Sequence, residues 1–110
     1  MPVWNNAHKL SVDVHKLTID LPRSEDYSLT SQIRRSSSSV PSNIAEAFGR
    51  KTQKDKSNFY VIARGSAFET QNHLIYGEAV GYFRDKEIHL FLNKYDELIF
   101  ELNKIISSLS

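Results

Sequence analysis

The chain has 110 residues, no cysteine, and nearly balanced charge, with 14 basic and 13 acidic side chains. This length fits one domain, and 40% hydrophobic residues suffice for a packed core, which excludes disordered and fibrous classes. The lack of cysteine excludes disulfide scaffolds, thiolate metal sites and cysteine nucleophiles. No apolar run approaches a membrane span, and Met1–His8 show no export signal, so we expect a cytoplasmic protein without a membrane role.

Apolar residues at steps of three and four predict a first helix over Val3–Leu21, which Pro22 ends. Ser28 is a candidate N-cap for a second helix that begins at Leu29. The apolar rhythm of the second helix continues across Pro41, which favours one kinked helix over two separate pieces. The expected buried positions of these two helices are Trp4, Ala7, Leu10, Val14, Leu17, Leu21, Ile33, Ser37, Val40, Ile44 and Ala47.

A third helix is predicted over Gln53–Val80, with Thr52 and Asp55 resembling a capping box at its start. We expect Gly65 and Ser66 beside its buried seam, and Gly81 in a left-handed turn after its end. The fourth helix carries a heptad seam of Ile88, Phe91, Tyr95, Leu98, Leu102, Ile105 and Leu109. Four long helices with short connections predict an all-α, antiparallel up-down four-helix bundle with a Pro-kinked second helix, as a single domain over residues 1–110.

Positive charge is concentrated in one part of the chain. Residues 34–64 hold seven basic and two acidic side chains, a local net charge of +5, whereas the remainder is net negative. Several cations close together can contact adjacent phosphates, and a solvated helix end is the competing interpretation. The candidate nucleic-acid-binding residues are Arg34, Arg35, Arg50, Lys51, Lys54, Lys56 and Arg64.

Polar side chains on the second and third helices predict a hydrogen-bonded network between them. Its candidate members are Asn43, Glu46, Ser66 and Glu69, with Arg50 and Arg64 as further partners. Fixing the register of the two helices is the favoured role, and a functional site is the alternative.

The sequence supports neither a metal site nor catalysis. His8 and His15 lie seven residues apart on one helix, about 10.5 Å, which is too far to ligate one ion. No phosphate-binding or nucleophile motif is present, so we expect no cofactor, no metal and no enzymatic activity. Phe100 and Leu90 lie off the apolar stripe of the fourth helix, which indicates self-association or a docked partner protein.

The stretch from Leu29 to Arg35 and the Pro-Ser-Asn-Ile-Ala-Glu stretch from Pro41 to Glu46 resemble a known family. This is the four-helix-bundle family first noticed as proteins encoded in intervening sequences of bacterial large-subunit ribosomal RNA genes. Trp4 and Phe59 also match its first and third helices, so the resemblance covers essentially the whole chain. It implies a homopentamer. Some relatives in that family bind nucleic acid and a reverse transcriptase. The resemblance therefore implies RNA, DNA or a reverse transcriptase as possible partners.

Two functions therefore remain open at the level of sequence. The first is a non-enzymatic homo-oligomer that binds nucleic acid through its basic segment. The second is a protein-interaction scaffold, in which the basic residues serve solubility or contacts between subunits.

Overall fold

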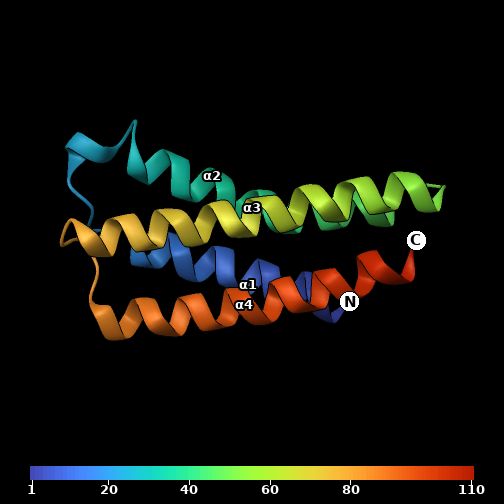
Figure 1. Ribbon diagram of the computed structural model, residues 1–110. Helices are drawn as coiled ribbons and strands as arrows, with labels where there is room; N and C mark the ends of the chain where they lie inside the picture. The colour runs from blue at the N-terminus through green and yellow to red at the C-terminus, as the bar shows by residue number, and fades with distance from the viewer.

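The computed structural model describes all 110 residues as four α-helices joined by short connections. The elements are α1 (Pro2–Leu17), a 3-10 helix η1 (Arg23–Glu25), α2 (Leu29–Phe48), α3 (Gln53–Ala79) and α4 (Asp85–Ser108). Consecutive helices run antiparallel, and both chain termini lie at the same end as the α2–α3 turn (Figure 1). The predicted four-helix bundle is therefore confirmed. No helix is both long and apolar enough to cross a membrane.

One continuous core fills the bundle, because each helix turns its apolar stripe inward. The α2–α3 interface is the most extensive, and α1 and α4 are the least closely packed neighbours. The predicted stripes are confirmed at the positions buried in the core, and the outer members Trp4, Leu17 and Leu21 are half-buried against it.

The first helix ends earlier than predicted. Its regular hydrogen bonding stops at Leu17 instead of continuing to Leu21. The Thr18 hydroxyl donates to the carbonyl of Val14 at 2.8 Å, and the Arg34 side chain binds the Thr18 hydroxyl at 2.9 Å. The backbone N–H groups of Thr18 and Ile19 also bond to the last carbonyls of α1, so the helix closes in a tight turn four residues before Leu21.

The predicted Ser28 cap of the second helix is wrong in its chemistry. Ser28 occupies the N-cap position, but its side chain makes no capping hydrogen bond. Glu25 takes this role, because its Oε1 accepts from the backbone N–H of Leu29 at 3.2 Å. The helix then continues through Pro41 without a break, as predicted.

The connection from α3 to α4 is a tight glycine turn. The N–H of Gly81 donates to the carbonyl of Glu78 at 3.1 Å, and that of Tyr82 donates to the carbonyl of Gly77 at 2.8 Å. This pair of bonds is a Schellman motif, which requires a left-handed residue. Gly81 supplies it with a φ of 91°, so the predicted left-handed turn is confirmed.

Candidate nucleic-acid interface

Four of the predicted phosphate-binding side chains lie together at the α2–α3 turn. We call them the α2–α3 basic cluster: Arg50, Lys51, Lys54 and Lys56. Lys51 and Lys54 are exposed and make no hydrogen bond or ion pair within the chain. These two ammonium groups are therefore available to an anionic ligand.

Arg50 and Lys56 have partners within the fold. The Arg50 guanidinium contacts Glu46 Oε2 at 3.3 Å and lies 4.5 Å from the centre of the Phe59 ring. Lys56 Nζ donates to the carbonyls of Ala47 and Phe48 at 3.1 and 3.3 Å. Because the C-terminus of α2 carries partial negative charge, Lys56 compensates that charge first. It contributes less to the positive potential of the surface than Lys51 or Lys54.

The start of α3 adds donors to the same end of the bundle. Thr52 caps this helix, because its hydroxyl oxygen accepts from the N–H of Asp55 at 3.1 Å. Free N–H groups and the positive end of the helix dipole favour anions here, and Lys54 lies in the first turn. The Asp55 carboxylate opposes this effect locally.

The other three predicted cations lie away from the α2–α3 basic cluster. Arg34 lies about 24 Å from Arg50, measured along the axis of α2. Its Nη2 donates to the His15 carbonyl of α1 at 3.4 Å. Arg64 Nη1 donates to Asn103 Oδ1 at 2.8 Å and so joins α3 to α4. Arg35 is exposed and unpaired. The seven predicted residues therefore occupy three places: the α2–α3 basic cluster, the neighbouring Arg34 and Arg35 on α2, and Arg64 on α3.

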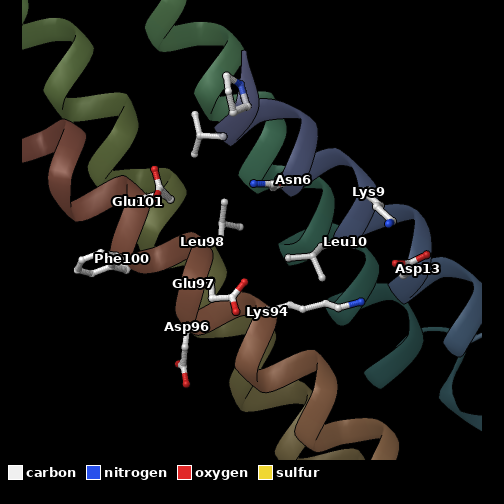
Figure 2. A pocket seen from close by; sticks show the side chains of 12 residues that line it. Asn6, Lys9, Leu10, Asp13, Lys94, Asp96, Glu97, Leu98, Phe100 and Glu101 are labelled. Carbon is white, nitrogen blue, oxygen red and sulfur yellow. The ribbon is translucent and has the colours of Figure 1, made fainter.

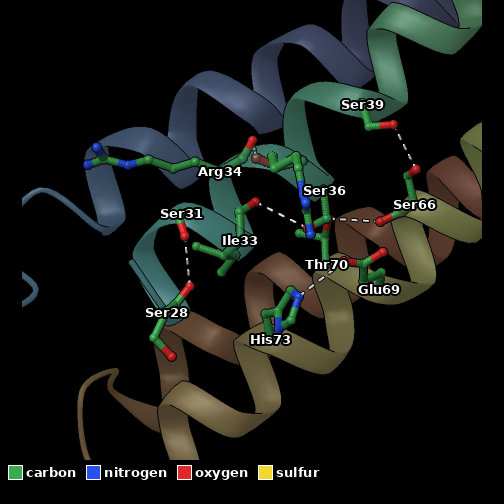
Figure 3. A network of polar contacts seen from close by, with 12 residues as sticks. Ser28, Ser31, Ile33, Arg34, Ser36, Ser39, Ser66, Glu69, Thr70 and His73 are labelled. Carbon is green, nitrogen blue, oxygen red and sulfur yellow. Dashed lines mark hydrogen bonds and ion pairs between the residues drawn. The ribbon is translucent and has the colours of Figure 1, made fainter. Parts of the chain in front are cut away.

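A layer of hydroxyl groups joins α2 to α3 (Figure 3). The Ser36 and Thr70 hydroxyls are 2.8 Å apart, and the Ser39 and Ser66 hydroxyls are 2.9 Å apart. Asn43 extends the layer, because its Nδ2 donates to Ser39 Oγ at 2.9 Å. The two hydroxyl pairs fix the register of the helices, since each joins one turn of α2 to one turn of α3, whereas the Asn43 bond lies within α2.

Only part of the predicted polar network belongs to this layer. Asn43 and Ser66 are brought together through Ser39. Glu46 instead contacts Arg50 on its own helix, and Glu69 contacts His73 on its own helix at 3.3 Å. Glu46 and Arg50 pair at the i,i+4 spacing of one helix, and the cross-helix contact expected of Glu69 is wrong, because its carboxylate is exposed.

Sequence reasoning missed Ser36, Ser39 and Thr70. The available signal was spacing: Ser36, Ser39 and Asn43 follow steps of three and four, as the buried face of a helix does. None of these hydroxyls contacts a histidine or a carboxylate. The layer therefore contains no base-activated nucleophile.

Comparison with known proteins identifies a matching family and a solved structure with a similar fold. The family model described as 23S rRNA-intervening sequence protein matches residues 1–104. A solved structure from Bacteroides thetaiotaomicron, described as a protein with unknown function from the S23 ribosomal protein family, superposes with a TM-score of 0.85. It is 24% identical in sequence, and the match covers 94% of this chain and 97% of that one. No curated protein matches the sequence.

Proposed function

Because the chain belongs to the 23S rRNA-intervening sequence protein family, we propose that it is a non-enzymatic homo-oligomer that binds RNA or DNA. The observation that carries the proposal is the α2–α3 basic cluster. Two free ammonium groups, an arginine on an aromatic ring and a helix N-terminus gather at one end of the bundle. This arrangement suits a phosphate backbone, which is recognised through charge and backbone N–H groups.

Self-association would make a weak contact strong. The chain has a formal net charge of only +1, so one copy of the cluster attracts a polyanion weakly. An oligomer presents several copies, and each further contact is intramolecular once the first has formed. The homopentamer that the resemblance implies would carry five clusters, and light scattering of the purified chain counts the subunits.

The test replaces both free lysines of the α2–α3 basic cluster by glutamine. We expect Lys51→Gln with Lys54→Gln to weaken binding of labelled RNA and DNA at least about tenfold near 0.1 M salt. The slope of log affinity against log salt is negative. Its magnitude should decrease by about 2 for each subunit that contacts a duplex. Fluorescence anisotropy across a salt series measures both quantities.

A matched pair of substitutions controls for the loss of charge. Lys9→Gln with Lys16→Gln removes the same charge from exposed, unpaired lysines of α1. This control should bind nucleic acid much as the wild type does. If both double variants weaken binding equally, only overall charge matters; if neither changes affinity or slope, the cluster is not the binding surface.

A protein-interaction scaffold is the second candidate function. The observation that favours it is the exposure of two large apolar side chains on α4, Phe100 at 61% and Leu90 at 63%. Lys104 Nζ lies 5.4 Å from the centre of the Phe100 ring, which leaves most of that ring free for a partner.

The scaffold is tested at Phe100. Because the ring is exposed, Phe100→Asp should leave the helical circular dichroism unchanged. It should remove partner proteins from a pull-down or lower the mass of the oligomer, since a carboxylate cannot enter an apolar contact. Unchanged partners together with an unchanged mass would argue against this function.

A further inference from the structure

One aromatic ring is exposed at the end of the bundle that carries the α2–α3 basic cluster. Phe48 is the last residue of α2 and is 65% exposed, more than any of the other phenylalanines. The residue before it, Ala47, is fully buried. The last turn of α2 therefore buries a methyl group and leaves an aromatic ring in solvent.

Packing within the single chain does not account for Phe48. Its side chain belongs neither to the core nor to the half-buried residues that pack against the core. The apolar area of the ring therefore adds little to the stability of the bundle. A lone exposed aromatic residue is ordinary on a protein surface, so its neighbours decide what it can bind.

The neighbours of Phe48 are cations. Arg50 and Lys51 follow it by two and three residues, and Lys54 lies in the first turn of α3. The Phe48 carbonyl accepts from Lys56 Nζ at 3.3 Å, which ties the start of α3 to the end of α2. The Arg50 side chain remains 46% exposed although it forms an ion pair. Phe48 therefore lies within the α2–α3 basic cluster.

A shallow hollow of about 360 Å³ lies next to Phe48. Its lining includes Ala45, three residues before Phe48 on the helix surface, and Gly49, which follows Phe48 in the chain. The lining also includes Arg50 and its ion-pair partner Glu46. Because alanine and glycine are small, a planar group can approach the end of α2 beside the ring.

Lysines and an aromatic ring recognise different parts of a nucleotide. Lysines bind phosphates, which duplexes and single strands both present. An aromatic ring stacks on the face of a base, and inside a duplex that face is covered by the neighbouring base pairs. Cations combined with an exposed ring are therefore typical of surfaces that bind single strands.

We propose that Phe48 stacks on an unpaired base of single-stranded RNA or DNA, whose phosphates lie against Lys51 and Lys54. This inference rests on the proposed nucleic-acid binding and specifies the ligand as an unpaired strand. An oligomer offers one such ring in each subunit, so a single strand can contact several of them.

The groove between α1 and α4 is a larger hollow, about 730 Å³, but its charge does not suit this ligand. Leu10 and Leu98 face each other across it, while Phe100 points away from α1 (Figure 2). Four carboxylates and two ammonium groups line the groove: Asp13, Asp96, Glu97, Glu101, Lys9 and Lys94. Their net charge of −2 repels phosphates, so the α2–α3 end is the favoured place for the strand.

Substitutions at Phe48 separate stacking from charge. Phe48→Leu keeps an apolar side chain but removes the aromatic face, and Phe48→Trp supplies a larger face. Because the ring is exposed, both variants should keep the helical circular dichroism and the mass of the oligomer. A lower mass for Phe48→Leu would identify the ring as a contact between subunits and would overturn the proposal.

The probe is a labelled oligothymidine of about twelve nucleotides, compared with an abasic strand of the same length. The abasic strand keeps every phosphate and offers no base to stack. We expect the wild type to bind the thymidine strand at least about fivefold more tightly than the abasic strand. Phe48→Leu should remove this difference, and Phe48→Trp should retain it. The same comparison with oligouridine distinguishes RNA from DNA as the ligand.

The salt dependence gives an independent readout. Because the salt slope reports phosphate contacts, Phe48→Leu should leave the slope for the thymidine strand unchanged. Lys51→Gln with Lys54→Gln should decrease its magnitude. Phe48→Leu should also leave the affinity for duplex DNA unchanged. An equal loss of affinity for the duplex and for the single strand would overturn the stacking role.

Phe68→Leu is the matched control. Phe68 is 53% exposed on α3, about 21 Å from Lys54 along the helix axis. The nearest lysine or arginine of this helix is Arg64, which donates to Asn103. Gly65 is exposed on the same face, so the expectation that it lies beside the buried seam of α3 is wrong. Phe68→Leu should bind both strands as the wild type does, and loss of the preference for bases in this variant would contradict the assigned site.

The two strands also separate failure of this inference from failure of the proposed function. A wild type that binds the thymidine and abasic strands equally well binds nucleic acid without stacking, which overturns the role of Phe48 alone. A wild type that binds neither strand nor the duplex at low salt overturns nucleic-acid binding as well.

Discussion

A Tyr95→Ala variant is expected to lose about 3–5 kcal/mol of the free energy of unfolding, whereas Tyr95→Phe should lose little or none. Tyr95 is 0% exposed and is among the largest fully buried side chains. Truncation to alanine leaves a cavity in the middle of the bundle, which the neighbouring helices can fill only partly.

The phenylalanine variant separates the ring from its hydroxyl. Tyr95 Oη is buried without a well-aligned hydrogen-bond partner, and the nearby Thr70 hydroxyl compensates its desolvation only in part. Removing it leaves the packing of the ring in place. If Tyr95→Phe were as destabilising as Tyr95→Ala, the contact between Tyr95 Oη and the Thr70 hydroxyl would be a strong hydrogen bond.

The same variant has a pH signature. Burial raises the pKa of Tyr95 well above its ordinary value of 10, the charge of Asp13 raises this pKa further, and the nearby Thr70 hydroxyl offsets part of the rise. The folded state therefore keeps this proton at a pH where the unfolded chain has lost it. The resulting stability is fully present below about pH 10 and is lost as the pH rises above that value.

Urea unfolding followed by circular dichroism at pH 7 and above pH 10 measures both effects. The wild type should lose stability between the two values by up to about 1.4 kcal/mol per pH unit from this group. Tyr95→Phe should lose less. Some loss remains, because burial also raises the pKa of Tyr60, and the hydrogen bond to Glu25 raises that of Tyr82.

The fold was predictable because its signals are local and periodic. The heptad rhythm of α4 and the continuity of α2 across Pro41 both follow from residue spacing alone. The end of α1 was less predictable, because Arg34, which bonds to Thr18 and to the His15 carbonyl there, comes from the next helix. A terminus that depends partly on a tertiary contact has only part of its signal in its own segment.

The candidate site was also predictable only where its residues are close together in the chain. Sequence located the cluster of cations around the α2–α3 turn, since these residues are close in the chain. It could not show that Lys56 is committed to the carbonyls of α2, or that Arg64 binds Asn103 on α4. The free charges, Lys51 and Lys54, are identified only by accounting for the partners of the others.

Gly77→Ala is the second substitution with a large expected effect, a loss of about 1–3 kcal/mol from overpacking. A Cβ at Gly77 would overlap the ring of Phe83. Phe83 is 7% exposed, so its ring can move away only by disturbing the core at the α3–α4 connection. Urea unfolding at pH 7 measures the loss.

A double-mutant cycle with Phe83→Ala assigns the effect to this contact. Phe83→Ala is itself destabilising, because it empties a buried site. In that background the clash is absent, and Gly77→Ala should raise stability by roughly 0.5–1 kcal/mol, since alanine is the better helix former. The sign of the Gly77→Ala effect therefore reverses between the two backgrounds. The same sign in both would show that the glycine is needed for a reason other than Phe83.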